Sequence, residues 1–310
     1  MRAARIHAYG GWEDIRYDEI PVPEPGADEL LVRVKTASIN PLDVKLVKGT
    51  VQDRFPINLP YTLGTDIAGV VEKAGPLAAR FAVGDTVFGR LAPMKGGGFA
   101  EFAVMPAIDV GLAPKSLLPG EIAGLPAACG TAWEGVFELG KLKKGQSVLV
   151  HAGAGGVGSY AVQLAKLAGA YVFATASGDG LQIARSRGAD HVIDYRNEDF
   201  VQVCREVDLV IDTIGGATQE RSFGVLKHGG TLVCVTEAAD GRKAAEKDIK
   251  THRLVHQMRG SRLELMAALM EQGKLTCHVD SVFPFEEIPA AIARNATRQA
   301  KGKILIHMGS

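Results

Sequence analysis

The stretch Gln146–Ala168 reads QSVLVHAGAGGVGSYAVQLAKLA, and its pattern decides the fold. The apolar run VLV contains β-branched residues, which is typical of a strand buried on both faces. Gly153, Gly155 and Gly158 follow at the spacing of the dinucleotide-binding fingerprint. A run of small and apolar residues then indicates a helix. Strand, glycine-rich loop and helix therefore stand in the order expected of a nucleotide site.

Each glycine of this loop has a physical reason. The first permits a tight turn, the second lets the backbone approach a pyrophosphate, and the third lets the helix pack closely on the strand. Amide groups at the start of the helix bind phosphate oxygens. The alternative is a glycine-rich turn without a ligand. We predict that the nucleotide contacts six consecutive residues, which are Gly153, Ala154, Gly155, Gly156, Val157 and Gly158.

The composition is that of an ordinary globular protein. The 310 residues suffice for about two domains, and 46% of them are hydrophobic and 23% charged. Lys plus Arg and Asp plus Glu number 35 each, so no net charge attracts nucleic acid or an anionic membrane. No apolar run is long enough to cross a membrane, and the first residues lack a signal-peptide pattern. We therefore expect a cytoplasmic protein. Its four cysteines form no Cys-x-x-Cys pair, so we expect them to be reduced.

The first 118 residues have the pattern of short strands and turns. Leu30 to Ala37 alternates apolar and polar residues with period two, which predicts a half-buried strand. We interpret this region as a partly open β-barrel, in which further strands are predicted at Ile67–Val71, Thr86–Phe88 and Phe99–Val104.

Around Pro119 the pattern changes to alternating helices and strands, which predicts a parallel, doubly wound sheet. After about residue 260, a helix at Arg262–Met270 and a strand at Val282–Phe285 precede a helix at Ile288–Asn295 and a last strand at Lys303–His307. The fold class is therefore α/β. The final HMGS is compatible with a cloning remnant.

The segment from Arg242 to Arg262 is rich in Lys, Arg and His. His252 and His256 are four residues apart and could share a helix face, but we interpret them as surface or core histidines. A nucleic-acid patch is the alternative for the segment. Because Glu246 and Asp248 interrupt the basic residues, we favour a solvated face or a subunit edge.

Five ordered motifs resemble one known family over essentially the whole chain. They are HAGAGGVG in the loop, ASINPLDVKLVKG at 37–49, LPYTLGTDIAGVV at 59–71, GADHVIDYRNEDF at 188–200, and the C-terminal KGKILI. The chain resembles the zinc-independent quinone oxidoreductases, the zeta-crystallin-like branch of the medium-chain dehydrogenase/reductase superfamily. The resemblance implies a GroES-like catalytic domain from residues 1–118 and 260–310, and a Rossmann NADP-binding domain at 119–259.

The resemblance also implies a site and an assembly. The active cleft would lie between the domains, at the carboxyl ends of the parallel strands, where α/β folds generally bind ligands. Relatives often form homodimers by pairing their nucleotide sheets edge to edge. Here Leu232–Val235 and Lys250–Met258 would form that edge.

The residues present argue against catalytic zinc. In zinc-dependent relatives a Cys and a His bind the metal, whereas the corresponding positions here resemble Asn40 and Thr65 or Asp66. A catalytic zinc site needs about three protein ligands, and residues 1–118 offer only His7 and no cysteine. We expect no metal.

The strand after the glycine loop ends without an acid, which favours NADP(H), because an acid there would repel a 2′-phosphate. By resemblance, Ser177 and Tyr195 contact that phosphate and Arg298 adds a charge. Gly180 stands where relatives often have lysine, which weakens the expected preference. Further contacts to the ribose and nicotinamide, carried over from the family, are Thr213, Ile214, Gly215, Val235 and Thr236.

The expected chemistry is hydride transfer from NADPH to a small-molecule electron acceptor, a quinone or an α,β-unsaturated carbonyl compound. Negative charge then develops on a carbonyl oxygen, where a hydrogen-bond donor is needed. Asn40 is the first candidate, Tyr61 is a candidate proton donor, and Thr131 would by resemblance touch the nicotinamide side. The alternatives are an enoyl-thioester reductase and a non-catalytic NADPH-binding structural or regulatory protein. Thr50 stands where such thioester reductases carry a tyrosine.

Overall fold

A computed structural model describes residues 1–254 and 259–309 of the chain. These residues form two compact units. The first unit comprises residues 1–127, 259–273 and 279–309, and the second comprises residues 128–254 and Lys274–His278. The chain passes from the first unit into the second within helix α3 (Pro126–Trp133), somewhat later than the domain boundary expected from the sequence.

The second unit contains a six-stranded sheet whose pairs are all parallel. The strand order is β11-β10-β9-β12-β13-β14, so the direction of winding reverses between β9 and β12. The predicted doubly wound sheet is confirmed. Its strands are β9 (Ser147–Val150), β10 (Tyr171–Ala176), β11 (His191–Asp194), β12 (Val207–Asp212), β13 (Leu226–Cys234) and β14 (Lys250–Arg253).

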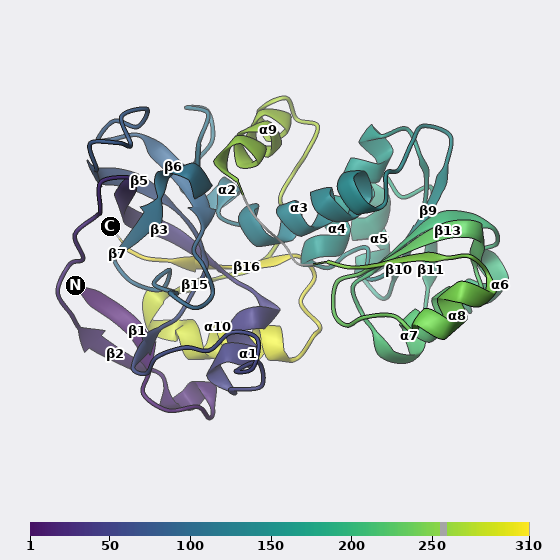
Figure 1. Cartoon of the computed structure of the whole chain (residues 1–310), viewed down its shortest axis with the longest axis horizontal. Helices are drawn as coiled ribbons and strands as arrows, with labels where there is room; N and C mark the ends of the chain where they lie inside the picture. The colour runs from purple at the N-terminus through teal and green to yellow at the C-terminus, as the bar shows by residue number, and fades with distance from the viewer. Residues whose placement is uncertain (255–258, 310) are drawn as a thin grey trace. The chain divides into compact units, whose positions relative to one another are not determined.

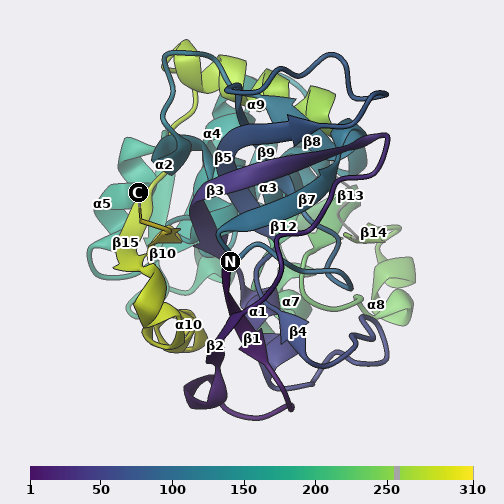
Figure 2. The same cartoon turned by 90° about the vertical axis from the view of Figure 1, so that its left-hand side faces the viewer.

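Helices cover both faces of this sheet. Both views place α4 and α5 on one side of it and α7 and α8 on the other (Figures 1 and 2). The helices are α4 (Gly156–Leu167), α5 (Gly180–Ser186), α6 (Phe200–Val203), α7 (Gly216–Ser222) and α8 (Gly241–Glu246), and α3 continues into a π-helical turn, η3 (Glu134–Leu139). Because both faces are covered, the central strands are apolar throughout, and Leu149, Val210 and Leu232 are completely buried.

The first unit contains a seven-stranded sheet and a three-stranded sheet. In the larger sheet the order is β15-β16-β3-β5-β6-β8, with β7 pairing separately with β3, and in the smaller it is β2-β1-β4. The expected partly open barrel is confirmed. Its strands are β1 (Arg2–Ile6), β2 (Arg16–Glu19), β3 (Glu29–Ile39), β4 (Tyr61–Thr62), β5 (Asp66–Ala74), β6 (Thr86–Arg90), β7 (Phe102–Pro106), β8 (Val110–Leu112), β15 (Val279–Pro284) and β16 (Lys303–His307).

The C-terminal elements complete the first unit. Strand β16 pairs antiparallel with β3, and Figure 2 shows α10 near the N-terminal strands β1 and β2. The helices of this unit are α1 (Pro41–Val47), α2 (Pro119–Ile122), α9 (Gly260–Glu271) and α10 (Ile288–Ala296), with short 3₁₀ turns η1 (Trp12–Asp14), η2 (Ala107–Asp109) and η4 (Phe285–Glu287).

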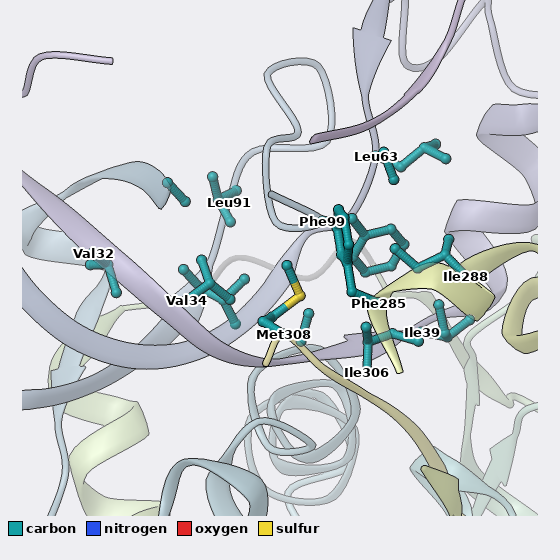
Figure 3. Close-up of a cluster of buried hydrophobic side chains, with 14 of the residues drawn as sticks. Val32, Val34, Ile39, Leu63, Leu91, Phe99, Phe285, Ile288, Ile306 and Met308 are labelled. Carbon is teal, nitrogen blue, oxygen red and sulfur yellow. The ribbon is translucent and has the colours of Figure 1, made fainter. Parts of the chain in front are cut away.

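Residues from both ends of the chain share one apolar core in the first unit. Ile39 and Phe99 lie in the same cluster as Phe285, Ile306 and Met308, as Figure 3 shows. Since Met308 is 5% exposed and its amide donates to the carbonyl of Lys35 at 3.1 Å, it is part of the fold. Burial of these side chains holds residues 279–309 against the N-terminal strands of the same unit.

Three local predictions need correction. Strand β7 covers Phe102–Pro106, because Phe99 and the preceding glycines instead pair irregularly with residues 62–64. His252 lies on strand β14 next to Val233, so it shares no helix face with His256, which lies outside the described residues. The predicted sheet edge is only partly right: β14 forms it, whereas Leu232–Val235 does not, because β13 lies between β12 and β14. Residues 255–258 of the predicted edge lie outside the described residues.

No helix in residues 1–254 and 259–309 is long and apolar enough to cross a membrane.

Candidate functional site

The glycine-rich loop lies at the carboxyl end of β9, where the winding of the sheet reverses. Ala152 adopts a positive φ of 52°, which turns the chain out of the strand. Two backbone bonds then hold the loop: the Gly153 amide donates to the Thr175 carbonyl at 2.8 Å, and the Gly155 amide donates to the Ala152 carbonyl at 2.8 Å. The loop therefore has a fixed shape without a ligand.

Helix α4 begins at Gly156, with Gly155 as its N-cap residue. The first amides of an α-helix have no partner within the helix, and here they belong to Gly156, Val157 and Gly158. A Cβ atom on Gly158 would lie 2.0 Å from the Ala152 carbonyl oxygen, and one on Gly153 would lie 2.7 Å from the Ala174 Cβ. Close packing of loop, helix and strand thus requires these two glycines, while the half-buried helix start, with its unpaired amides, suits a phosphate group.

Ser177 and Tyr195 lie together beyond the ends of β10 and β11. The Ser177 hydroxyl donates to the Tyr195 phenol oxygen at 2.9 Å, and the Tyr195 amide donates to the Ala176 carbonyl at 3.2 Å. A Cβ on Gly180 would lie 3.1 Å from that of Ala154, so a residue with a side chain at 180 would press on the glycine loop. The two hydroxyls are brought together as the sequence analysis expected of a shared ligand contact.

The loop after β12 is held from inside by Asp212. This buried carboxylate accepts the amides of Ile214 at 2.9 Å and Gly215 at 3.1 Å, and the side-chain amide of Gln219 at 3.0 Å. The Thr213 hydroxyl donates to the His151 carbonyl at 2.9 Å, which ties the same loop to the end of β9. Residues 213–215 therefore lie beside the glycine loop.

The loop after β13 contacts this same segment. The Val235 amide donates to the Asp212 carbonyl at 2.9 Å, and the Gly216 amide donates to the Glu237 carboxylate at 2.6 Å. Gly215 has a φ of 82°, and a Cβ there would lie 2.6 Å from the Thr236 hydroxyl. The structure thus brings together the predicted residues Thr213, Ile214, Gly215, Val235 and Thr236. The supporting carboxylate of Glu237 was missed, because it is distant in sequence from the glycine motif.

His151 connects three elements below the loop. Its ring nitrogens lie 3.3 Å from the Thr175 hydroxyl and 2.9 Å from the Ser222 hydroxyl. Burial lowers the pKa of His151 to about 4, although the nearby Asp212 carboxylate acts in the opposite direction. The imidazole is therefore neutral near pH 7, and it fixes the strand ends rather than offering a charge.

In the first unit, Asn40 is the centre of a buried polar cluster. It stands at the N-terminal end of α1 and is 6% exposed. Its backbone amide donates to the Asp43 carboxylate at 2.7 Å, and its side-chain Nδ2 donates to Asp66 Oδ2 at 3.0 Å. Lys303 Nζ donates to Asn40 Oδ1 at 2.7 Å and to the Ile39 carbonyl at 3.1 Å. Both polar ends of the Asn40 amide therefore have charged partners.

Asp66 is the anionic member of this cluster. Besides Asn40, its Oδ2 accepts from the Ala127 amide at 3.0 Å and the Ser38 hydroxyl at 3.4 Å. Arg90 Nε lies 3.9 Å from Asp66 Oδ1. The side chain of Asp66 is completely buried, and the donors to Oδ2 replace the water that this oxygen has lost. Asp66 Oδ1 has no hydrogen-bond partner among the described residues and faces the charge of Arg90.

Asp43 is also completely buried, and burial raises the pKa of its carboxyl to about 7. The bond from the Asn40 amide lowers this pKa, whereas the nearby Asp66 charge raises it. Through the bond from the Asn40 amide, Asp43 orders the loop before α1.

Tyr61 occupies a different position from the other candidates of this unit. It is 3% exposed in the apolar core, and its hydroxyl donates to the Pro93 carbonyl at 2.6 Å. Burial raises the pKa of the phenol. Because the hydroxyl hydrogen is already donated to the Pro93 carbonyl, Tyr61 stabilises the fold of the first unit in this structure.

The two remaining candidates are Thr131 and Arg298. Thr131 is a buried residue of α3, in the second unit with the glycine loop. Arg298 follows α10 in the first unit, where it adopts a φ of 56° and its amide donates to the Asn295 carbonyl at 3.0 Å. The candidates thus divide between the two units: those around the glycine loop and Thr131 belong to the second, whereas Asn40, Tyr61 and Arg298 belong to the first.

Comparison with known proteins adds a second line of observation. Residues 26–116 match the family model "Alcohol dehydrogenase GroES-like domain", and residues 187–306 match "Zinc-binding dehydrogenase". The chain is 32% identical to the chloroplastic quinone-oxidoreductase QR1 of Triphysaria versicolor, over 99% of this chain and 98% of that protein.

Two further matches agree with these. The chain is 33% identical to a chloroplastic NADPH-dependent alkenal/one oxidoreductase of Arabidopsis thaliana, over 99% of this chain and 79% of that protein. Its fold matches the solved structure of the quinone oxidoreductase from Coxiella burnetii with a TM-score of 0.94 and 30% identity, over 100% of this chain and 99% of that one.

Proposed function

The chain belongs to the quinone oxidoreductase branch of the medium-chain dehydrogenase/reductase superfamily, and on this basis we propose a more specific activity. We propose that it transfers a hydride from NADPH to a quinone or to the β-carbon of an α,β-unsaturated carbonyl compound, without zinc. The observation that carries this proposal is the buried amide of Asn40, a neutral donor at a position where zinc-dependent relatives have a metal ligand.

The residues of the second unit fit a nicotinamide dinucleotide. A Cβ on Gly158 would fill space that the loop itself occupies, and the first amides of α4 are suited to a pyrophosphate. Thr213 and Val235 lie on loops that share backbone contacts with the end of β9 and with Asp212. When bound, the cofactor supplies the hydride. The protein holds it and orients the acceptor.

NADPH is the proposed form of the cofactor. The Ser177 and Tyr195 hydroxyls are 2.9 Å apart, so one phosphate group could accept from both once the Ser177 hydroxyl turns its hydrogen away from Tyr195. The last residues of β10 and the following Ser177 include no acid that would repel a 2′-phosphate. Gly180 offers no positive charge, and we therefore expect a moderate preference for NADPH, with Arg298 as a further proposed contact.

The residues around Asn40 do not fit catalytic zinc. Zinc is bound by cysteine, histidine and carboxylate groups, whereas Asn40 and Thr65 offer only neutral oxygen atoms. Asp66 is the one anion of the three, and its Oδ2 already accepts from Asn40 and the Ala127 amide. The Lys303 ammonium, 2.7 Å from Asn40 Oδ1, would repel a second cation. No group of three or more His, Cys, Asp or Glu side chains suited to a metal occurs among the described residues.

Asn40 has the chemistry that the reaction needs. Hydride addition leaves negative charge on a carbonyl oxygen of the acceptor, and a preorganised donor stabilises that charge. The Asn40 Nδ2 has two hydrogens, of which one is used by Asp66. The second is the proposed donor to the acceptor oxygen. Thr131 is proposed as a further contact on the nicotinamide side.

Steady-state kinetics test this proposal. Oxidation of NADPH and of NADH is measured with an aromatic ortho-quinone and with a small enone, for the wild type and for Asn40→Ala. We expect turnover with at least one acceptor, a higher kcat/KM with NADPH, and a loss of about 100-fold in kcat for Asn40→Ala. Turnover that is unchanged in Asn40→Ala would contradict the role of the amide. No turnover with NADPH still bound would favour a thioester substrate or a non-catalytic role.

A further inference from the structure

Lys303 is a buried ammonium in direct contact with the proposed donor. We propose that Lys303 is a positioning residue: it fixes the Asn40 amide with its nitrogen available as donor, and so acts on the reaction through Asn40. This inference rests on the proposed function, because it assigns Lys303 to the same site.

The contact is formed by the fold. Lys303 is the first residue of β16, and the next residue, Ile304, is paired with Ile39 on β3. This register places the Lys303 side chain at Asn40, which directly follows Ile39. The side chain of Lys303 is 4% exposed, and Nζ lies 2.7 Å from Asn40 Oδ1 and 3.1 Å from the Ile39 carbonyl oxygen. These two oxygen atoms therefore accept hydrogen bonds from the buried ammonium in place of water.

The charges on either side of Asn40 allow only one orientation of the amide. An ammonium can donate but cannot accept, and the Asp66 carboxylate, which already accepts from Ala127 and Ser38, accepts from Nδ2. Rotating the amide by 180° would place its NH2 group against the ammonium and its oxygen against the carboxylate. Lys303 and Asp66 together therefore keep the oxygen of Asn40 turned inward to the lysine.

The same contact strengthens Asn40 as a donor. A positive charge at the amide oxygen draws electron density from the nitrogen, and hydrogen bonds in a chain polarise one another. The hydrogen on Nδ2 that Asp66 does not use becomes a better donor as a result. Lys303 thereby contributes to charge stabilisation although it need not touch the acceptor.

A purely structural role for Lys303 would be to neutralise Asp66, since the two charged groups are 3.9 Å apart. The two roles differ in their dependence on Asn40. If Lys303 acts through Asn40, its removal has little further effect once the amide is absent. If it only neutralises Asp66, its removal has the same effect with or without the amide.

A double-mutant cycle separates the two roles. Lys303→Met, Asn40→Ala and the double variant are assayed with NADPH and an ortho-quinone, with the exposed Lys115→Met as a charge-matched control. We expect Lys303→Met to lower kcat about tenfold or more in the wild type but less than about twofold in Asn40→Ala, with KM for NADPH nearly unchanged. Equal losses of kcat in both backgrounds would overturn the inference.

Loss of Lys303 leaves Asp66 buried with one cation fewer, so Lys303→Met could unfold the first unit. Thermal unfolding identifies this case. The cycle is then repeated in the Asp66→Asn background, where Lys303→Met adds no uncompensated carboxylate. In this background the positioning role still predicts a loss of kcat that depends on the Asn40 amide, because Lys303 still contacts Asn40 Oδ1. Neutralisation of Asp66 predicts no loss, since no charge is left to neutralise, and an unchanged kcat would overturn the inference.

A readout that does not require turnover accompanies the cycle. The side-chain amide signals of Asn40 in a ¹⁵N spectrum are assigned by their loss in Asn40→Ala, and their exchange with solvent is measured. We expect slow exchange in the wild type and exchange at least about tenfold faster without Lys303. Unchanged exchange would contradict the positioning role. A wild type without oxidoreductase activity would refute the proposed function, but it would leave this measurement interpretable.

Discussion

Gly155 and Gly158 belong to one sequence motif, and the structure shows that a side chain would be tolerated very differently at the two positions. A Cβ on Gly158 would lie 2.0 Å from the Ala152 carbonyl oxygen, which is backbone and cannot move aside. A Cβ on Gly155 would lie 3.2 Å from the same oxygen, and Gly155 has a φ of −77°, which alanine also adopts. We predict that Gly158→Ala destabilises the fold and that Gly155→Ala does not.

The magnitude follows from the size of the clash. Placing a methyl group more than 1 Å inside contact distance forces the loop or α4 to shift, and overpacking of this kind costs about 2 kcal/mol. For a unit of this size, that corresponds to a decrease of roughly 4–8 °C in Tm. Gly155→Ala should leave Tm within about 1 °C of the wild type.

The assay combines thermal unfolding with a fluorescence titration of NADPH. Gly155→Ala should retain its Tm and bind NADPH at least about tenfold more weakly, because its methyl group occupies the place expected for the pyrophosphate. Gly158→Ala should lose both stability and affinity. Wild-type stability of Gly158→Ala would refute the packing argument, and wild-type affinity of Gly155→Ala would refute the assignment of the loop to phosphate binding.

Three other predictions concern stability and assembly. Tyr61→Phe removes the hydrogen bond to the Pro93 carbonyl and should lower the free energy of unfolding in urea by about 1 kcal/mol. Its kcat should stay within about twofold of the wild type. A loss of kcat without a loss of stability would instead make Tyr61 a proton donor. The folded pKa of His151, about 4, is below its unfolded value, so the unfolded chain binds the extra proton between about pH 6.5 and 4. Relative to His151→Gln, the wild type should therefore lose roughly 3 kcal/mol of stability as the pH falls through this window, and parallel pH profiles would contradict this. Finally, we propose a homodimer formed through the β14 edge of the sheet; sedimentation should give twice the chain mass, and a monomer at micromolar concentration would refute it.

Sequence patterns predicted the glycine loop of the site, whose residues are close together in the chain. The glycine loop, the strand before it and the helix after it were all recognised from residues 146–168, because the apolar run, the glycine spacing and the small-residue helix all lie within that segment. Asn40 was recognised from the family resemblance and from the ability of its amide to donate a hydrogen bond.

The partners of these residues could not be predicted, because they are remote in the sequence. Lys303 is 263 residues from Asn40, and only the pairing of β16 with β3 brings them into contact. Glu237 reaches the Gly216 amide by a similar long-range arrangement. For His252 the sequence left open a helix face shared with His256, and only the pairing with β13 shows that it lies on a strand.

The most direct test of the central claim follows the hydride itself. The protein is dialysed against a strong chelator and given NADPH that carries deuterium at the transferable C4 position, together with a small enone. We predict one deuterium on the β-carbon of the saturated ketone, at a rate equal to that before dialysis. A rate that falls on dialysis and returns with zinc, or a product without deuterium at that carbon, would contradict zinc-independent hydride transfer.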